Sequence, residues 1–157
     1  MSPRFDVPSL LAELTIEEKA ALLSGAGFWW TRRVERLGIP SMMMSDGPHG
    51  LRKQDRTNDH LGLDGSVPAT CFPTAAALGS SWDVDLLHRV GVAIGEEARS
   101  QDVGLVLGPG INIKRSPPCG RNFEYFSRTP SSPVSSAQPW SGACRARVWA
   151  PRSSISP

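Results

Sequence analysis

The chain has 157 residues, a net charge of +2 and 39% hydrophobic residues. This length fits a single domain, and the weak, scattered positive charge argues against a nucleic-acid-binding protein. No apolar run approaches the length that spans a bilayer, so no membrane partner is expected. The first ten residues contain no apolar core of a secretory signal. Cys71, Cys119 and Cys144 form no Cys-x-x-Cys pair, which indicates reduced thiols, no metal site and a cytoplasmic protein.

The first predicted element is a helix from Thr15 to Ser24. Thr15 is a candidate N-cap, and Glu18 three residues later completes a capping box. Gly25 is the expected stop signal just beyond the helix. The aromatic run 28–30 that follows fits either a wall on which a sugar stacks or an anchor in the core.

The most informative stretch runs from Met42 to Arg52. Its apolar start, Met42–Met44, predicts a buried strand, and the following glycines and proline predict a loop. Asp46 stands at this junction, and polar groups just past the C-terminal end of a strand face the ligand crevice in barrels and open α/β sheets. The alternative is a β-turn in which Asp46 only caps backbone N–H groups.

Further elements alternate along the rest of the chain. The small-residue run Pro73–Leu78 is consistent with a second buried strand, and Ser81 can cap a helix over about Asp83–Gln101. Val103–Leu107 predicts another strand, followed by Gly-Pro-Gly. A dinucleotide-binding loop would need a glycine where Ile113 stands, so we reject that interpretation. The alternation predicts an α/β fold with parallel strands.

Four stretches, in this order, resemble the motifs of glycoside hydrolase family 3, the β-glucosidase-like enzymes. They are Leu14–Lys19, Ser45–Arg52, Phe72–Asp83 and Gly120–Glu124. The resemblance implies that residues 1–127 are the incomplete first part of a TIM-type (β/α)8 barrel. It also implies a retaining hydrolase of O-glycosidic bonds, without a metal or cofactor, that acts on a β-glucoside or a related oligosaccharide.

The resemblance also assigns roles to individual residues. Asp46 matches an aspartate that binds sugar hydroxyls, for which a carboxylate suits because it accepts from two neighbouring hydroxyl groups. Arg52 and Arg121 match arginines of the same pocket, and Arg121 would be a hydroxyl donor. The alternative for these residues is an Asp–Arg pair that only fixes a loop. Glu124 is expected to be a structural ion-pair partner.

A retaining glycosidase needs two carboxyl groups about 5–5.5 Å apart, one as the nucleophile and one as the acid/base. In the family, both of these residues lie beyond the matched region, so no catalytic residue is assigned in this chain. We therefore expect this chain alone to be inactive. It is then either a non-catalytic sugar-binding fragment or a non-functional truncated product, and its uncovered apolar strands favour aggregation.

The last segment, 128–157, differs in composition from the rest, since it contains no Asp, Glu, Lys or His. It is expected to be a non-native, disordered tail. A reading-frame shift after Ser127 accounts for it: codons shifted by one base permit Glu-Asp-Pro-Leu-Leu-Ala-Gly in place of Arg128–Val134, as is typical of the family. The same shift over Arg147–Pro157 permits the Lys-His pair of the family's next motif.

Overall fold

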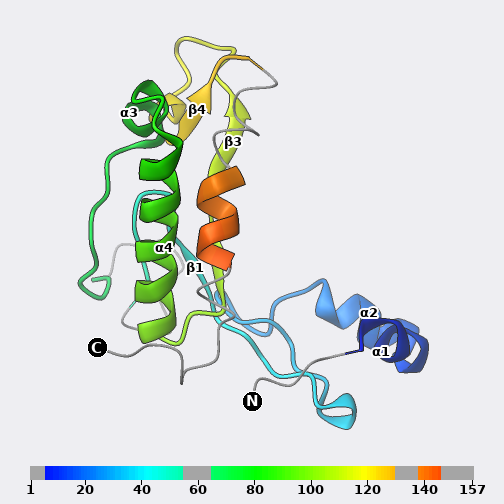
Figure 1. The fold of residues 1–157 in the computed structure, drawn as a ribbon. Coiled ribbons are helices and arrows are strands. Elements are labelled where there is room, and N and C mark those ends of the chain that lie inside the picture. The colour runs from blue at the N-terminus through cyan, green and yellow to red at the C-terminus, as the bar shows by residue number, and fades with distance from the viewer. Residues whose placement is uncertain (1–5, 55–64, 130–137, 146–157) are drawn as a thin grey trace.

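The computed structural model describes residues 6–54, 65–129 and 138–145 (Figure 1). No helix in these ranges is long and apolar enough to cross a membrane. The elements, in chain order, are α1 (Val7–Glu13), α2 (Ile16–Leu22), the 3-10 turn η1 (Glu35–Leu37), β1 (Met44–Asp46), α3 (Ala75–Ser80), α4 (Val84–Ser100), β2 (Leu105–Leu107), β3 (Gly110–Ile113), the 3-10 turn η2 (Asn122–Glu124) and β4 (Tyr125–Ser127), followed by a helix over 138–145.

Both strand pairs in the described ranges are parallel, which confirms the predicted α/β class. β1 pairs with β2, and β3 pairs with β4, so the described strands form two separate two-stranded sheets. α4 runs along one side of these strands, and the helix over 138–145 lies beside it (Figure 1). The barrel implied by the resemblance stays a prediction.

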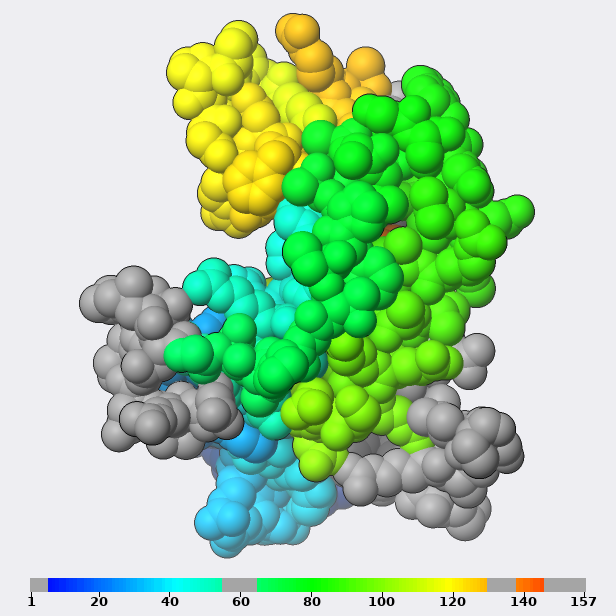
Figure 2. Space-filling model, turned by 90° about the vertical axis from the view of Figure 1, so that its left-hand side faces the viewer, coloured from blue at the N-terminus to red at the C-terminus, as the bar shows by residue number. Residues whose placement is uncertain are grey.

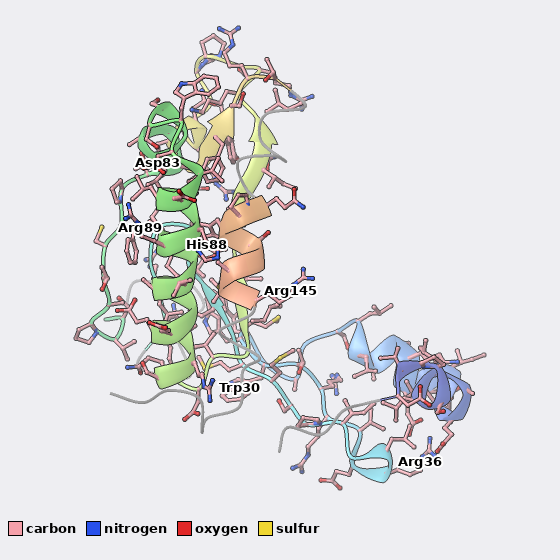
Figure 3. All side chains as sticks on the ribbon, viewed as in Figure 1. Trp30, Arg36, Asp83, His88, Arg89 and Arg145 are labelled. Atoms are coloured by element: carbon pink, nitrogen blue, oxygen red, sulfur yellow. The ribbon has the colours of Figure 1, made fainter. Side chains whose placement is uncertain are left out.

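The N-terminal helices form an arm that projects away from the sheets (Figure 1). Thr15 caps α2, and the predicted capping box with Glu18 is present. The helix ends at Leu22, with Leu23 as its C-cap, and so stops before the predicted Gly25. Neither α1 nor α2 contains a buried residue. The Arg36 side chain, at the far end of the arm in Figure 3, ties them together by donating to both carboxylate oxygens of Glu18 and to the backbone oxygen of Glu13.

The long helix α4 confirms its prediction with a different cap. Asp83, not Ser81, is the N-cap, and its carboxylate accepts the backbone N–H of Leu86 at 2.8 Å. Ser81 instead ends the preceding helix, where its hydroxyl donates to the Leu78 carbonyl oxygen at 2.6 Å. The buried face of α4 carries Leu87, Val90, Gly91, Ile94, Gly95 and Ala98.

The prediction of a strand at Pro73–Leu78 is wrong, because Ala75–Ser80 is the helix α3. Thr74 begins it by accepting the backbone N–H of Ala77. Alanine is the best helix former and has little to gain in a strand, where bulky side chains pack. Ala75 and Leu78 are buried, so the segment still contributes to the core as expected.

The expected disorder of 128–157 does not hold for residues 138–145, which are helical. Trp140 is only 1% exposed and belongs to the main core with residues of α3, α4 and β4. The helix approaches α4 closely at Gly91, where an added Cβ would lie 2.3 Å from the Trp140 carbonyl oxygen. The apolar side chains of this short helix therefore offset the cost of ordering it. Residues 130–137 and 146–157 lie outside the described ranges.

The three cysteines differ in accessibility, since Cys71 and Cys119 are exposed and Cys144 is buried. Burial raises the pKa of the Cys144 thiol to about 11. Only the thiolate is nucleophilic, so at pH 8 we expect iodoacetamide to alkylate Cys144 at least about 100-fold more slowly than the exposed pair. Peptide mass spectrometry over time measures the three rates. In urea the rates should converge, and equal rates in the folded chain would contradict the packing of the last helix.

Candidate functional site

The candidate site is an open pocket of about 530 Å³ where β1 ends. This volume falls in the range of small-molecule sites. Its walls come from three parts of the chain: the loop 46–52, the segment 66–71, and Phe123 with Glu124. Figure 2 shows a hollow between the segment that ends in η2 and β4 and the segment that follows β1.

Asp46 and Arg52, two of the residues predicted to bind sugar, both line this pocket. Asp46 is the last residue of β1, so the strand sets the position of its carboxylate. The loop then turns back, and the backbone N–H of Arg52 donates to the Asp46 carbonyl oxygen at 2.8 Å. This bond places the two residues side by side at the C-terminal end of a parallel strand, where ligand sites of such sheets lie.

The opposite wall, 66–71, is held against this loop from α4. One Glu97 carboxylate oxygen accepts both the backbone N–H of Thr70, at 2.9 Å, and its hydroxyl, at 3.1 Å. The chain at Thr70 comes so close to Gly50 that an added Cβ there would lie 2.0 Å from the Thr70 carbonyl oxygen. The next residues continue the contact, since the Phe72 N–H donates to the His49 carbonyl oxygen at 2.8 Å.

Arg121 stands beside the pocket rather than in its wall, and the structure pairs it with Glu124. Two guanidinium nitrogens, Nε and one terminal nitrogen, each lie 2.8 Å from the same Glu124 carboxylate oxygen. The predicted ion pair of Glu124 is therefore present, and Glu124 also lines the pocket. This carboxylate raises the pKa of Arg121, and the charge of Asp46 adds to the effect.

Two wall residues, His49 and Phe123, were not singled out as candidates, although both lie within the motifs noted above. Their rings lie 5.8 Å apart between centroids, tilted by 45°. Both imidazole nitrogens of His49 are buried without a hydrogen-bond partner. Burial lowers the pKa of His49, and the nearby Glu124 carboxylate opposes this shift. The ring is therefore kept neutral at pH 7, where an unperturbed histidine is already mostly uncharged. Phe123 adds an apolar patch.

The aromatic run 28–30 lies away from this pocket. The Trp29 indole N–H donates to the Gln54 side-chain oxygen at 2.7 Å, and its ring packs against a small core cluster around Met43. This contact supports the core-anchor interpretation for Trp29.

Among the described residues, no group of three or more His, Cys, Asp and Glu side chains is placed to hold a metal ion. The pocket instead offers a carboxylate, a guanidinium and apolar rings, which suits a neutral polyhydroxyl ligand.

Comparison with known proteins gives a consistent family. The model of the glycosyl hydrolase family 3 N-terminal domain matches residues 29–140. The thermostable β-glucosidase B of Acetivibrio thermocellus is 59% identical over 80% of this chain and 17% of its own length. The exo-α-(1→6)-L-arabinopyranosidase of Bifidobacterium longum is 55% identical over 75% of this chain and 16% of its own. The chain thus spans about a sixth of the length of these relatives.

Solved structures agree with this match. The family 3 β-glucosidase of Bifidobacterium adolescentis superposes with a TM-score of 0.73 and 46% identity, over 87% of this chain and 18% of its own. The β-glucosidase 3B of Thermotoga neapolitana, solved with α-D-glucose, superposes with a TM-score of 0.76 and 35% identity, over 91% of this chain and 22% of its own.

Proposed function

Because this chain belongs to glycosyl hydrolase family 3, we propose that it forms the hydroxyl-binding wall of a pyranoside site in a retaining β-glucosidase-type hydrolase. The observation that carries the proposal is that Asp46 and Arg52, joined by a backbone hydrogen bond, lie side by side at the end of β1. Both line a pocket large enough for a sugar ring. A pyranose offers adjacent hydroxyl groups. A carboxylate accepts from two of them at once, and a guanidinium donates to others.

Arg121 supports this wall from outside the pocket in the proposed arrangement. Its side chain is 72% exposed, so it is accessible to a ligand while Glu124 holds one side of it. Glu124 has a different role: the Arg121 guanidinium holds one of its carboxylate oxygens in an ion pair, so we assign it to positioning Arg121 rather than to catalysis. Asp46 and Glu124 are therefore not proposed as the catalytic pair.

Hydrolysis needs a nucleophile and an acid/base at a defined separation, and this chain is proposed to lack both. An aryl-β-glucoside should therefore show no turnover above the blank with the purified chain. Turnover that persists through purification and is lost in Asp46→Ala would contradict this part of the proposal.

Sugar binding is tested by titrating D-glucose into the chain, with ligand-observed NMR as the readout. We expect saturable binding that Asp46→Ala weakens about 10–100-fold, because hydrogen bonds to a charged group contribute roughly 1.5–3 kcal/mol each. Asp46→Asn keeps the size and loses the charge, so it should fall in between. Glu35→Ala, which removes an exposed carboxylate of the arm, is the matched control and should bind as the unaltered chain does.

Two outcomes would count against the binding role. Equal affinities for the Asp46 and Glu35 variants would assign Asp46 to the loop alone, and no saturable binding at all would favour a non-functional product. L-arabinopyranose is the second ligand to titrate, because one relative is named for that sugar. Tighter binding of arabinopyranose than of glucose would change the proposed substrate class.

A further inference from the structure

A second cavity, of about 150 Å³, lies between β2 and the helix over 138–145. One of its walls is the β2 segment, with Gly104, Leu105, Val106 and Gly108, and the other is the last helix, with Trp140, Ser141, Cys144 and Arg145. None of these residues lines the candidate sugar pocket. The cavity is therefore a separate candidate site.

The cavity depends on residues that the family domain does not include. The family match ends at residue 140, so Ser141, Cys144 and Arg145 all lie beyond it. A site built from these side chains belongs to this chain and not to the family fold. Its ligand therefore has to be inferred from the chemistry of its walls.

The volume limits the ligand to a small molecule. An engineered core cavity of roughly the same volume binds benzene, whereas drug-sized ligands occupy about 300–1,000 Å³. Leu105, Val106 and the Trp140 ring give the cavity an apolar surface. A short aliphatic group matches both this size and this surface.

The charge of the cavity comes from Arg145, the one charged side chain among the described residues that line it. Arg145 stands at the end of the last helix (Figure 3) and is exposed. It forms no ion pair with any described residue, and the sequence contains no Asp or Glu beyond Glu124. The planar guanidinium matches a carboxylate, to which it donates charge-assisted hydrogen bonds in pairs.

Trp140 adds a donor without a partner. It is 1% exposed, and its indole Nε1 is buried with no hydrogen-bond partner in the described structure. A buried donor without an acceptor is unfavourable, and an oxygen bound beside the ring would relieve this. Indole and guanidinium groups donate hydrogen bonds and accept none. These two side chains therefore favour a ligand that carries acceptor oxygens.

We propose that this cavity binds a short aliphatic carboxylate, with its charged end at Arg145 and Trp140 and its tail against Leu105 and Val106. Inorganic phosphate fits less well, because the two aliphatic side chains offer no donors to its further oxygens. A hydrocarbon also fits less well, because it would leave the guanidinium and the indole N–H without an acceptor.

The test titrates sodium butyrate into the full ¹⁵N-labelled chain at constant ionic strength and follows the indole N–H signals by NMR. The chain has 5 tryptophans, so Trp140→Phe and Trp82→Phe identify two of the signals by their disappearance. The Trp140 signal should shift saturably with butyrate, whereas the signal of Trp82, which is 88% exposed, should stay constant. Butyramide has the same size without the charge and should bind at least about tenfold more weakly.

Three variants separate charge from shape. Arg145→Gln removes the charge at an exposed position and should weaken butyrate binding at least about tenfold, whereas Arg145→Lys should recover part of the affinity. Arg33→Gln is the matched control, because it removes an exposed arginine of the arm, and it should bind butyrate as the unaltered chain does. Ser141→Leu keeps the charge but fills the cavity, so it should abolish the shift.

Cys144 gives a second readout, because it lines the cavity. Butyrate should slow the alkylation of Cys144 by iodoacetamide without changing the rate at the exposed Cys119. The proposal is overturned if the Trp140 signal does not move, if butyramide binds as tightly as butyrate, or if the glutamine variants of Arg145 and Arg33 have equal affinities.

Asp46→Ala separates this cavity from the proposed sugar pocket. The variant should bind butyrate as the unaltered chain does, because Asp46 lines only the sugar pocket. A chain that binds no glucose but still shows the Trp140 shift would leave this inference standing. Loss of butyrate binding in Asp46→Ala would place butyrate in the sugar pocket and overturn the inference.

Discussion

Replacing Trp140 by alanine is expected to lower the free energy of unfolding by about 3–5 kcal/mol, the usual cost of removing a large aromatic side chain from a core. Trp140 is among the most buried side chains of the described residues, at 1% exposure. It packs against buried residues of α3, α4 and β4, and Gly91 lets the last helix approach α4 closely.

Urea unfolding followed by near-UV circular dichroism measures this effect. Small domains have a total stability of about 5–15 kcal/mol, so the variant should unfold at a much lower urea concentration or lose its cooperative transition. Trp82→Ala is the control. Trp82 is 88% exposed, and its removal should change stability by less than about 0.5 kcal/mol. Equal midpoints for the two variants would show that the last helix does not pack as described.

The second large effect is expected at Gly50. Its φ of +128° lies in a region that side chains rarely adopt, and an added Cβ would lie 2.0 Å from the Thr70 carbonyl oxygen. Backbone strain alone costs on the order of 1–3 kcal/mol. The Thr70 segment cannot easily move away, because Glu97 of α4 holds its N–H and its hydroxyl. Gly50→Ala should therefore destabilise the chain by about 3 kcal/mol or more and open the pocket wall.

Hydrogen exchange provides a local readout for this variant. The Phe72 N–H, bonded to the His49 carbonyl oxygen across the two walls, should lose its protection in Gly50→Ala. Gly65→Ala is the matched control, since no atom lies within 4 Å of the added Cβ. If both variants retained Phe72 protection, the close approach of the two walls would be contradicted.

The sequence predicted those elements whose signals are local. The capping box of Thr15 and Glu18, the apolar period of α4 and the apolar run before Asp46 each act within a few residues. The capping box and α4 are confirmed, whereas the strand predicted over Met42–Met44 begins only at Met44 and includes Asp46. The run at Pro73–Leu78 was misassigned because short apolar runs suit strands and helices alike. The decisive signal was Thr74, which follows a proline and can cap a helix.

The last helix was missed for a different reason. The segment around Trp140 has the composition of a disordered tail, and only contact with α4 makes its helix stable. One local signal was present: Pro139 stands at the start of the helix, where proline is favoured. The short strands β3 and β4 have three or four residues each, too few for an alternating pattern to identify them, and only their pairing across residues 114–124 defines them.

The sequence indicated individual residues of the candidate pocket but not its shape. Asp46 and Arg52 lie together in the pocket wall because a strand end and a short loop set their positions, while their role in sugar binding stays a prediction. The wall at Thr70 could not be predicted, because it depends on Glu97 in a helix more than twenty residues later. Nor could the sequence show that Arg121 stands outside the pocket wall, since only the fold sets its distance from Asp46.

The arm and the body of this molecule are held by different forces. A guanidinium on the surface joins the first two helices to the turn that follows them, whereas tryptophan and aliphatic groups join the last helix to the sheets. Salt screens the ion pair that holds the first two helices, but it leaves the apolar packing of the last helix largely unaffected. At high salt concentration we therefore expect α1 and α2 to lose their contacts first, and the helix over 138–145 to remain packed.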